Sequence, residues 1–179
     1  MSTSKRIVVG AVALLAACAS QPQSGKPPAF GATVSADEIA LWDISIPPSG
    51  EGLPAGSGSV KQGEAVYAAK CQSCHGEKGI GKPADALVGG KGTLATKAPV
   101  RTVGSYWPHA TTLFDYVRRA MPIANPLSLS NDEVYAVSAY VLNLNGIVPA
   151  DAVMNAQTLP QVKMPNREGF VSDWPPRPR

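Results

Sequence analysis

Residues 71–75 read Cys-Gln-Ser-Cys-His, which places two thiols and an imidazole within five positions. Two cysteines at this spacing can form a disulfide, one half of a zinc site, a redox pair or a covalent haem anchor. The haem anchor is the arrangement that uses all three residues. Both sulfurs can reach the two vinyl groups on one porphyrin edge, and the histidine then comes beneath the iron. We therefore predict one covalent haem c, attached through Cys71 and Cys74, with His75 as the proximal ligand.

The other interpretations of this motif explain less of the sequence. Tetrahedral zinc needs four ligands, and the only other histidine, His109, lies 34 residues farther on without a paired ligand at zinc-finger spacing. A thioredoxin-like redox pair is typical of a βαβ context, which the sequence does not indicate. A structural disulfide leaves His75 without a role.

A haem iron bound by His75 has a sixth position, for which Met121, Met154 and Met164 are candidates. A thioether sulfur favours ferrous iron and raises the reduction potential. Met121 is favoured because it ends a predicted helix, precedes a proline and lies 46 residues after His75, far enough to fold over the opposite haem face. We expect Met154 and Met164 to be packing residues. His109 is the alternative ligand, and a second histidine would lower the potential.

Three main helices are predicted to position these residues. Ser59 and Gln62 have the spacing of a capping box, and an apolar stripe leads from there into the cysteine motif. Gly63 in mid-helix costs about 1 kcal/mol relative to alanine, so we expect another backbone to approach closely there. Apolar residues at helical spacing indicate a second helix over 110–121. A second capping box, Ser130-x-x-Glu133, predicts a third helix that ends near Gly146.

The N-terminus has the features of a targeting segment. Lys5 and Arg6 precede an apolar run, Ile7 to Ala17, that is too short to span a bilayer as a mature helix. The run ends Leu-Ala-Ala-Cys, which resembles a bacterial lipobox and predicts lipidation of Cys18 after removal of residues 1–17. Ordinary cleavage after Ala17-Cys18-Ala19 is the alternative and would leave no anchor. We expect a periplasmic, membrane-anchored lipoprotein.

The remaining sequence is divided by its composition. Residues 18–58 read as a tether, a short helix from a capping box at Ser35, and a Pro/Gly-rich strap. Residues 59–146 form the expected haem domain, and 147–179 an irregular Pro-rich tail on the surface. No strand pattern stands out. The haem domain carries nine basic and six acidic side chains, an excess too small and too scattered to indicate nucleic-acid binding.

The order of helix, CxxCH, long loop, helix with a terminal methionine, and C-terminal helix resembles the class I cytochrome c fold across residues 59–146. The resemblance implies an all-α fold of three main helices around one covalent haem. It also implies that the first and last helices cross at Gly63, Tyr67 and Tyr140. Because the haem would supply much of the core, we expect the apoprotein to be largely unfolded.

A narrower resemblance extends into both flanks. The stretches EIALWDISIPPSGEGLPAGSGSVKQGEAVYAAKC, VGSYWPHATTLFDYVRRAMP, NDEVYAVSAYVLNLNGIV and LPQVKMPNREGF resemble the cytochrome c subunit of bacterial sulfite or sulfane dehydrogenases of the Sox sulfur-oxidation system. This resemblance implies a separate molybdenum-containing subunit as electron donor, and another cytochrome or a terminal oxidase as acceptor. The chain itself would carry one electron at a time and would not be catalytic on its own.

Other functions stay open from the sequence. A general membrane-tethered shuttle to a terminal oxidase would use the same haem ligands. A haem enzyme or gas sensor would need an open sixth position at the iron. An envelope lipoprotein with only a structural role would leave the CxxCH motif unexplained.

Overall fold

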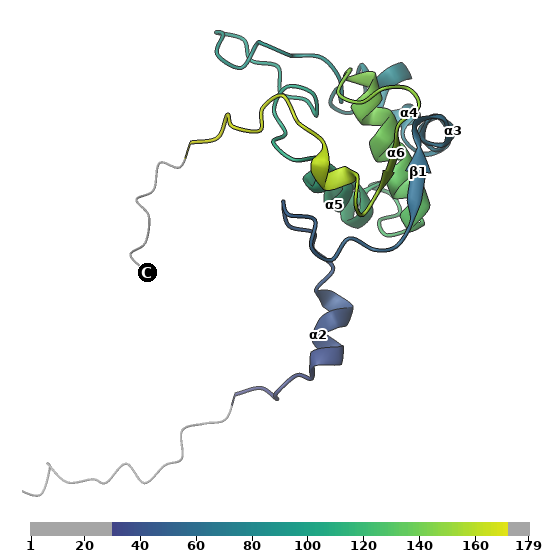
Figure 1. The fold of residues 1–179 in the computed structure, drawn as a ribbon, viewed down its shortest axis with the longest axis vertical. Coiled ribbons are helices and arrows are strands. Elements are labelled where there is room, and N and C mark those ends of the chain that lie inside the picture. The colour runs from purple at the N-terminus through teal and green to yellow at the C-terminus, as the bar shows by residue number, and fades with distance from the viewer. Residues whose placement is uncertain (1–29, 172–179) are drawn as a thin grey trace, which may run out of the picture. The chain divides into compact units, whose positions relative to one another are not determined.

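The computed structural model describes residues 30–171, so the predicted signal segment 1–17 and Cys18 lie outside the described residues. The chain divides into two compact units, Met1–Leu41 and Trp42–Arg179. Figure 1 shows the helices and strands of the described part. In chain order these are α2 (Ala36–Trp42), β1 (Ser57–Ser59), α3 (Val60–Lys70), α4 (Gln72–His75), the 3₁₀ turn η1 (Glu77–Gly79), α5 (Ala110–Ala120), α6 (Asn131–Leu144), β2 (Val153–Asn155) and the 3₁₀ turn η2 (Leu159–Gln161).

The short helix α2 forms where the capping sequence predicts it. The Ser35 hydroxyl accepts a hydrogen bond from the Glu38 N–H at 3.2 Å, as a helix N-cap does. None of its residues is buried. Within residues 30–171, no helix has the length and apolar character needed to cross a membrane.

Helices α3 and α6 cross at the predicted glycine. Both begin with the predicted capping boxes, Ser59 with Gln62 and Ser130 with Glu133. A Cβ on Gly63 would overlap the carbonyl oxygen of Ala136 in α6, so only glycine permits this approach.

An aromatic contact sits at the same crossing. The rings of Tyr67 and Tyr140 pack against each other with centroids 5.4 Å apart. The predicted roles of Gly63, Tyr67 and Tyr140 are therefore confirmed.

Helix α6 is the central element of the core. All its residues from Val134 to Leu142 are buried, which requires neighbours on more than one face. Helix α3 covers one side and α5 another, where the rings of Phe114 and Tyr135 lie 4.4 Å apart. The predicted all-α architecture with three main helices is confirmed.

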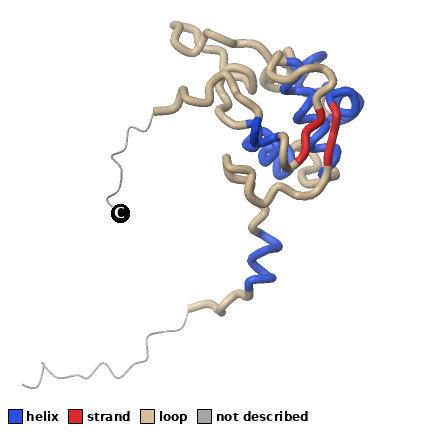
Figure 2. The backbone as a smooth tube through the Cα atoms, in the orientation of Figure 1, coloured by secondary structure: helices blue, strands red, loops and turns tan. Residues whose placement is uncertain are grey.

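The structure also contains a small sheet that the sequence did not indicate. Strands β1 and β2 pair antiparallel, with Ser57 opposite Asn155 and Ser59 opposite Val153 (Figure 2). Gly58, between them, is buried against the backbone of Ala136, where a side chain would overlap α6. These three-residue strands lack the length that makes an alternating pattern readable.

The segment after α6 is irregular, as expected, but it does more than lie on the surface. Met154, Leu159, Val162 and Met164 are buried and belong to the same hydrophobic core as the helices. Pairing of β2 with β1 draws this segment back across α6. The expectation of a purely superficial tail was therefore incomplete, because buried residues spaced irregularly leave no periodic signal.

Candidate haem site

The cysteine motif forms a short helical turn directly after α3. Cys71 ends α3 and opens α4, and its carbonyl accepts hydrogen bonds from the N–H groups of Cys74 (3.1 Å) and His75 (3.0 Å). Residues three apart on a helical turn point to the same side. The two sulfurs are thus presented together, as attachment to one porphyrin edge requires. Neither cysteine forms a disulfide; Cys71 is half-buried and Cys74 is exposed.

The surroundings of the Cys71 thiol disfavour its charged form. Burial and, second, the neighbouring Cys74 raise the pKa of Cys71 to about 11. A redox-active or metal-binding cysteine is typically held as a thiolate by a lowered pKa. The surroundings of Cys71 do not lower its pKa in this way.

The His75 ring is oriented by one hydrogen bond. Its Nδ1 lies 2.8 Å from the carbonyl oxygen of Asp85. A carbonyl can only accept, so Nδ1 is the donor, and in the neutral ring Nε2 then carries the lone pair. Ligating histidines are commonly oriented by a hydrogen bond to the second ring nitrogen. His75 therefore fits the role of a proximal iron ligand through Nε2.

The loop after the motif is held by a set of short hydrogen bonds. The Gly81 N–H donates to the His75 carbonyl at 2.7 Å, and the Ala84 N–H donates to the Cys74 carbonyl at 2.8 Å. The Tyr67 hydroxyl donates to the Gly76 carbonyl at 2.8 Å. Burial and, second, nearby Cys71 raise the pKa of Tyr67 to about 12, so this hydroxyl stays a donor. The motif is thus tied both to α3 and to the following loop.

Met121 lies at the end of α5, as the sequence predicts. Its N–H donates to the Val117 carbonyl at 3.1 Å, which closes the last turn, and its side chain is half-buried. Met154 and Met164 are buried in the hydrophobic core, as expected for packing residues. Among the methionines of residues 30–171, Met121 is therefore the one whose thioether is not already committed to the core.

His109 lies at the opposite end of α5, where it is the N-cap residue without a side-chain capping bond. At 1.5 Å per residue, twelve positions separate it from Met121 by about 18 Å along the helix. The two cannot bind the same iron. Burial first, and then Arg167, lower the pKa of His109, and its Nδ1 is buried without a hydrogen-bond partner within the described structure. The surroundings of His109 thus include Arg167, in the segment after α6.

The segments next to the predicted ligands carry apolar side chains on their surface. Ile80, five residues after His75, is 70% exposed, and Ile123 and Leu127, just beyond Met121, are 75% and 61% exposed. A porphyrin is a flat, mainly apolar group whose faces need contacts of this kind. These residues therefore add apolar surface to the two segments that carry the predicted ligands.

The residues present fit a c-type haem. Cys71 and Cys74 would hold it covalently, and His75 Nε2 and the Met121 sulfur would bind the iron. The haem supplies a one-electron redox centre when it is bound. Within residues 30–171 no group of three or more His, Cys, Asp or Glu side chains is clustered so that it could hold a bare metal ion.

Comparison with known proteins identifies the class of this chain. Residues 58–141 match the protein family described as cytochrome C oxidase, cbb3-type, subunit III. The chain is also similar to one solved in the crystal structure of the sulfane dehydrogenase SoxCD from Paracoccus pantotrophus. The identity is 43%, the TM-score is 0.76, and the match covers 80% of this chain and 71% of that chain. The chain therefore belongs to the class I c-type cytochromes, haem proteins of electron transfer. No curated protein matches it.

Two features of the site were not anticipated from the sequence. The Asp85 carbonyl that orients His75 is a backbone group, so no residue type could reveal it. Asp115 is buried in α5 next to the apolar stripe that includes Phe114 and Val117. A single aspartate in an amphipathic helix is read as solvated unless its partner is known.

Proposed function

We propose that the protein is the electron-transfer subunit of a sulfur-compound dehydrogenase. One haem c, held by Cys71, Cys74, His75 and Met121, would accept one electron at a time from a separate molybdenum-containing sulfite or sulfane dehydrogenase subunit. Another cytochrome or a terminal oxidase would then take the electron. The observation that carries this proposal is the similarity to SoxCD, which covers 80% of the chain, whereas the general cytochrome match is confined to residues 58–141. The flanks are thus part of the likeness.

The residues of the site suit a carrier better than an enzyme. Ligands on both faces of the iron keep reorganisation small during electron transfer and deny substrates access to the metal. His75 is oriented by Asp85, and the backbone after the motif is fixed by the bonds to Gly81 and Ala84. A site held this firmly changes little between the two redox states.

We further propose that the protein works in the periplasm and is anchored to the membrane through lipidated Cys18. Support comes from the basic residues, the short apolar run and the lipobox-like sequence at the N-terminus. Acyl chains on one residue anchor strongly, since each buried CH₂ contributes about 0.8 kcal/mol. Mass spectrometry of the mature N-terminus tests this, and an unmodified terminus at Ser20 or beyond would contradict it.

The first experiment on function is metal and haem analysis of the protein purified gently from its native membrane. We expect one haem per chain and stoichiometric molybdenum that arrives with a second, larger polypeptide. Sulfite and thiosulfate are then the substrates to test. Haem without molybdenum in an intact preparation would contradict the dehydrogenase assignment and favour a free-standing membrane-tethered carrier.

A further inference from the structure

The end of α5 that carries Met121 has little support from the core. The buried residues of α5 are confined to its first half, from Ala110 to Asp115. From Tyr116 to Met121 every residue is exposed or only half-buried. Helix ends without buried side chains open most easily. Val117 packs against the core from this half of the helix. With so few core contacts, bonds outside the core can contribute much of the restraint on the last turn before Met121.

Asp115 is placed to supply that restraint. It is the last buried residue of α5 and only 8% exposed. Its Oδ1 accepts hydrogen bonds from the backbone N–H of Ile46 and from Arg119 Nε, each at 2.9 Å. Its Oδ2 is paired with Arg119 Nη2 at 2.5 Å. One carboxylate thus ties the final turns of α5 to each other and to a segment 69 positions earlier in the chain.

Two other side chains on α5 hold the same segment, residues 44–48. From here on, the name strap refers to these five residues alone. The Thr111 hydroxyl donates to the Pro48 carbonyl at 3.1 Å. Arg118 Nη1 donates to the Ile44 carbonyl at 3.4 Å. Positions 111, 115 and 118 recur at helical spacing, so they lie along one side of α5. The strap therefore runs along the helix toward the end that carries Met121.

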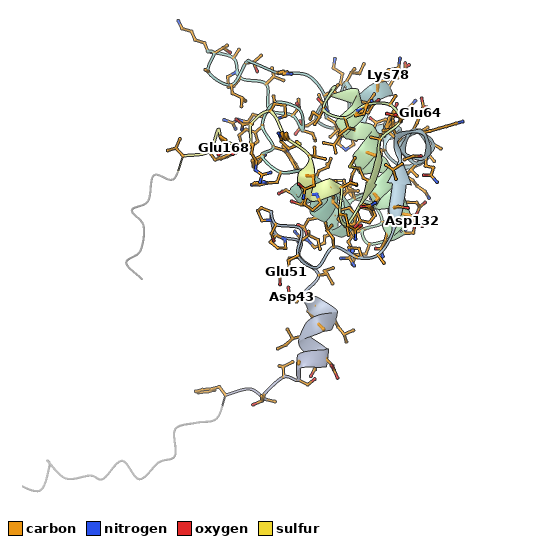
Figure 3. The ribbon with its side chains drawn as sticks, in the orientation of Figure 1. Asp43, Glu51, Glu64, Lys78, Asp132 and Glu168 are labelled. Atoms are coloured by element: carbon orange, nitrogen blue, oxygen red, sulfur yellow. The ribbon has the colours of Figure 1, made fainter. Side chains whose placement is uncertain are left out.

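The chain after the strap is fastened to α6. The Tyr135 hydroxyl donates to the Pro54 carbonyl at 2.9 Å. The Asp132 carboxylate, labelled in Figure 3, accepts from the Ser57 N–H at 2.7 Å. Residues 44–57 consequently bridge α5 to α6, the helix on which α3 and its cysteine motif also pack.

We propose that Asp115 is a positioning residue that holds Met121 in place for the iron by fastening the strap to the last turns of α5. This inference rests on the proposed role of Met121 as axial ligand. Removing the carboxylate leaves the buried Ile46 N–H and the Arg119 guanidinium without their acceptor, which is costlier than losing an exposed bond. The loss falls on the turns that connect Asp115 to Met121, so the methionine should dissociate more often while the rest of the fold stays intact.

The test compares haem-loaded variants for ligand dissociation and for global stability. Cyanide binding to the ferric protein reports how often the sixth position opens. Urea titration, followed by the far-red sulfur-to-iron band and by the helix signal, separates local from global unfolding. The variants are Asp115→Ala, which removes every acceptor, and Asp115→Asn, which keeps one acceptor for the Ile46 N–H. Tyr135→Phe is the matched control, because it removes the bond that fastens Pro54, in the chain just after the strap, to α6 instead of α5.

We expect Asp115→Ala to bind cyanide about tenfold faster than the unmodified protein, the factor that about 1.4 kcal/mol of local destabilisation produces. Its sulfur-to-iron band should disappear at lower urea than its helix signal. The cyanide-binding rate of Asp115→Asn should fall between those of Asp115→Ala and the unmodified protein. Tyr135→Phe should lower the urea midpoint of both signals together and leave the cyanide rate within about twofold of the unmodified protein.

Two outcomes would overturn the proposal and are distinguishable. If Asp115→Ala and Tyr135→Phe bind cyanide at the same rate, Asp115 contributes only to global stability. Met121→Ala sets the fastest rate expected. If that variant keeps the sulfur-to-iron band and binds no faster than the unmodified protein, the ligand assignment itself fails, and the role of Asp115 fails with it.

Discussion

The hydrogen bond from His75 Nδ1 to the Asp85 carbonyl leaves Nε2 as the ring nitrogen that would bind the iron. A neutral imidazole has one donor and one acceptor nitrogen, and a carbonyl partner fixes the donor. Cys71 is half-buried, and this burial raises the pKa of its thiol. The proposed opposite ligand, Met121, is the methionine in residues 30–171 that the core leaves free.

The identity of the sixth ligand is tested at this scale. Met121→Ala should abolish the far-red sulfur-to-iron band of the oxidised protein, because no other half-exposed methionine lies in the described chain. His109→Ala is the matched control and should keep the band, since His109 lies at the other end of α5. An absorption spectrum of each ferric variant decides. Retention of the band in Met121→Ala with its loss in His109→Ala would reverse the assignment.

Helix α6 connects the two predicted ligand segments. It packs against α3, which leads into the cysteine motif, and against α5, which ends at Met121 (Figure 1). The approach of α3 depends on the absence of a side chain at Gly63, beside the Ala136 carbonyl. A change at this crossing therefore acts on the cysteine motif through the position of a whole helix.

For Gly63→Ala, the crossing predicts a change in stability opposite in sign to the one that helix propensity predicts. Alanine is favoured over glycine in a helix interior by about 1 kcal/mol. Gly63→Ala should nevertheless destabilise the protein by about 2–3 kcal/mol, because its Cβ would overlap the Ala136 carbonyl and force the helices apart. Urea unfolding of the haem protein measures this. Ala68→Gly, at an exposed position of the same helix, is the control and should cost about 1 kcal/mol. A more stable Gly63→Ala would contradict the observed crossing.

In the unit that begins at Trp42, segments far apart in the sequence complete the core. The segment after α6 contributes Met154, Leu159, Val162 and Met164, and β2 pairs with β1 at the start of α3. The exposed charges Glu64, Lys78, Asp132 and Glu168 lie around the edge of this body (Figure 3). The segments before α3 and after α6 thus complete the core. The match to SoxCD covers 80% of the chain and so extends into these segments, beyond the residues 58–141 that match the cytochrome family.

The pH dependence of stability should reflect Asp115. Burial alone would raise the pKa of Asp115, but hydrogen bonds from Arg119 and from the Ile46 N–H outweigh it and hold that pKa below its usual value. A carboxyl whose pKa is lower in the folded state stabilises the fold above its unfolded pKa of about 4. This contribution is lost as the pH falls through the folded pKa.

We expect the unfolding free energy to fall steadily below about pH 4, and Asp115→Asn to flatten this part of the curve. Urea titrations of the helix signal between about pH 3 and pH 7 measure the slope. Asp151→Asn, which removes one carboxylate at an exposed position, controls for the change in formal charge. Equal slopes for Asp115→Asn and the unmodified protein would show that this carboxyl does not link folding to protons.

The cysteine motif, both capping boxes, the Gly63 crossing and the methionine at the end of α5 were all predictable from the sequence. The motif, the capping boxes and the methionine are each specified by residues within a few positions of one another, so covalent spacing and helical periodicity reveal them. The partner of Gly63 in the crossing was implied by the resemblance to the class I cytochromes. The pairing of Ser57 with Asn155, the burial of Leu159 and Val162, and the bond from Ile46 to Asp115 were decided only by the tertiary structure. These contacts join residues tens of positions apart, and their free energy depends on which groups folding removes from water together. No local sequence pattern predicts which of these distant groups are buried together.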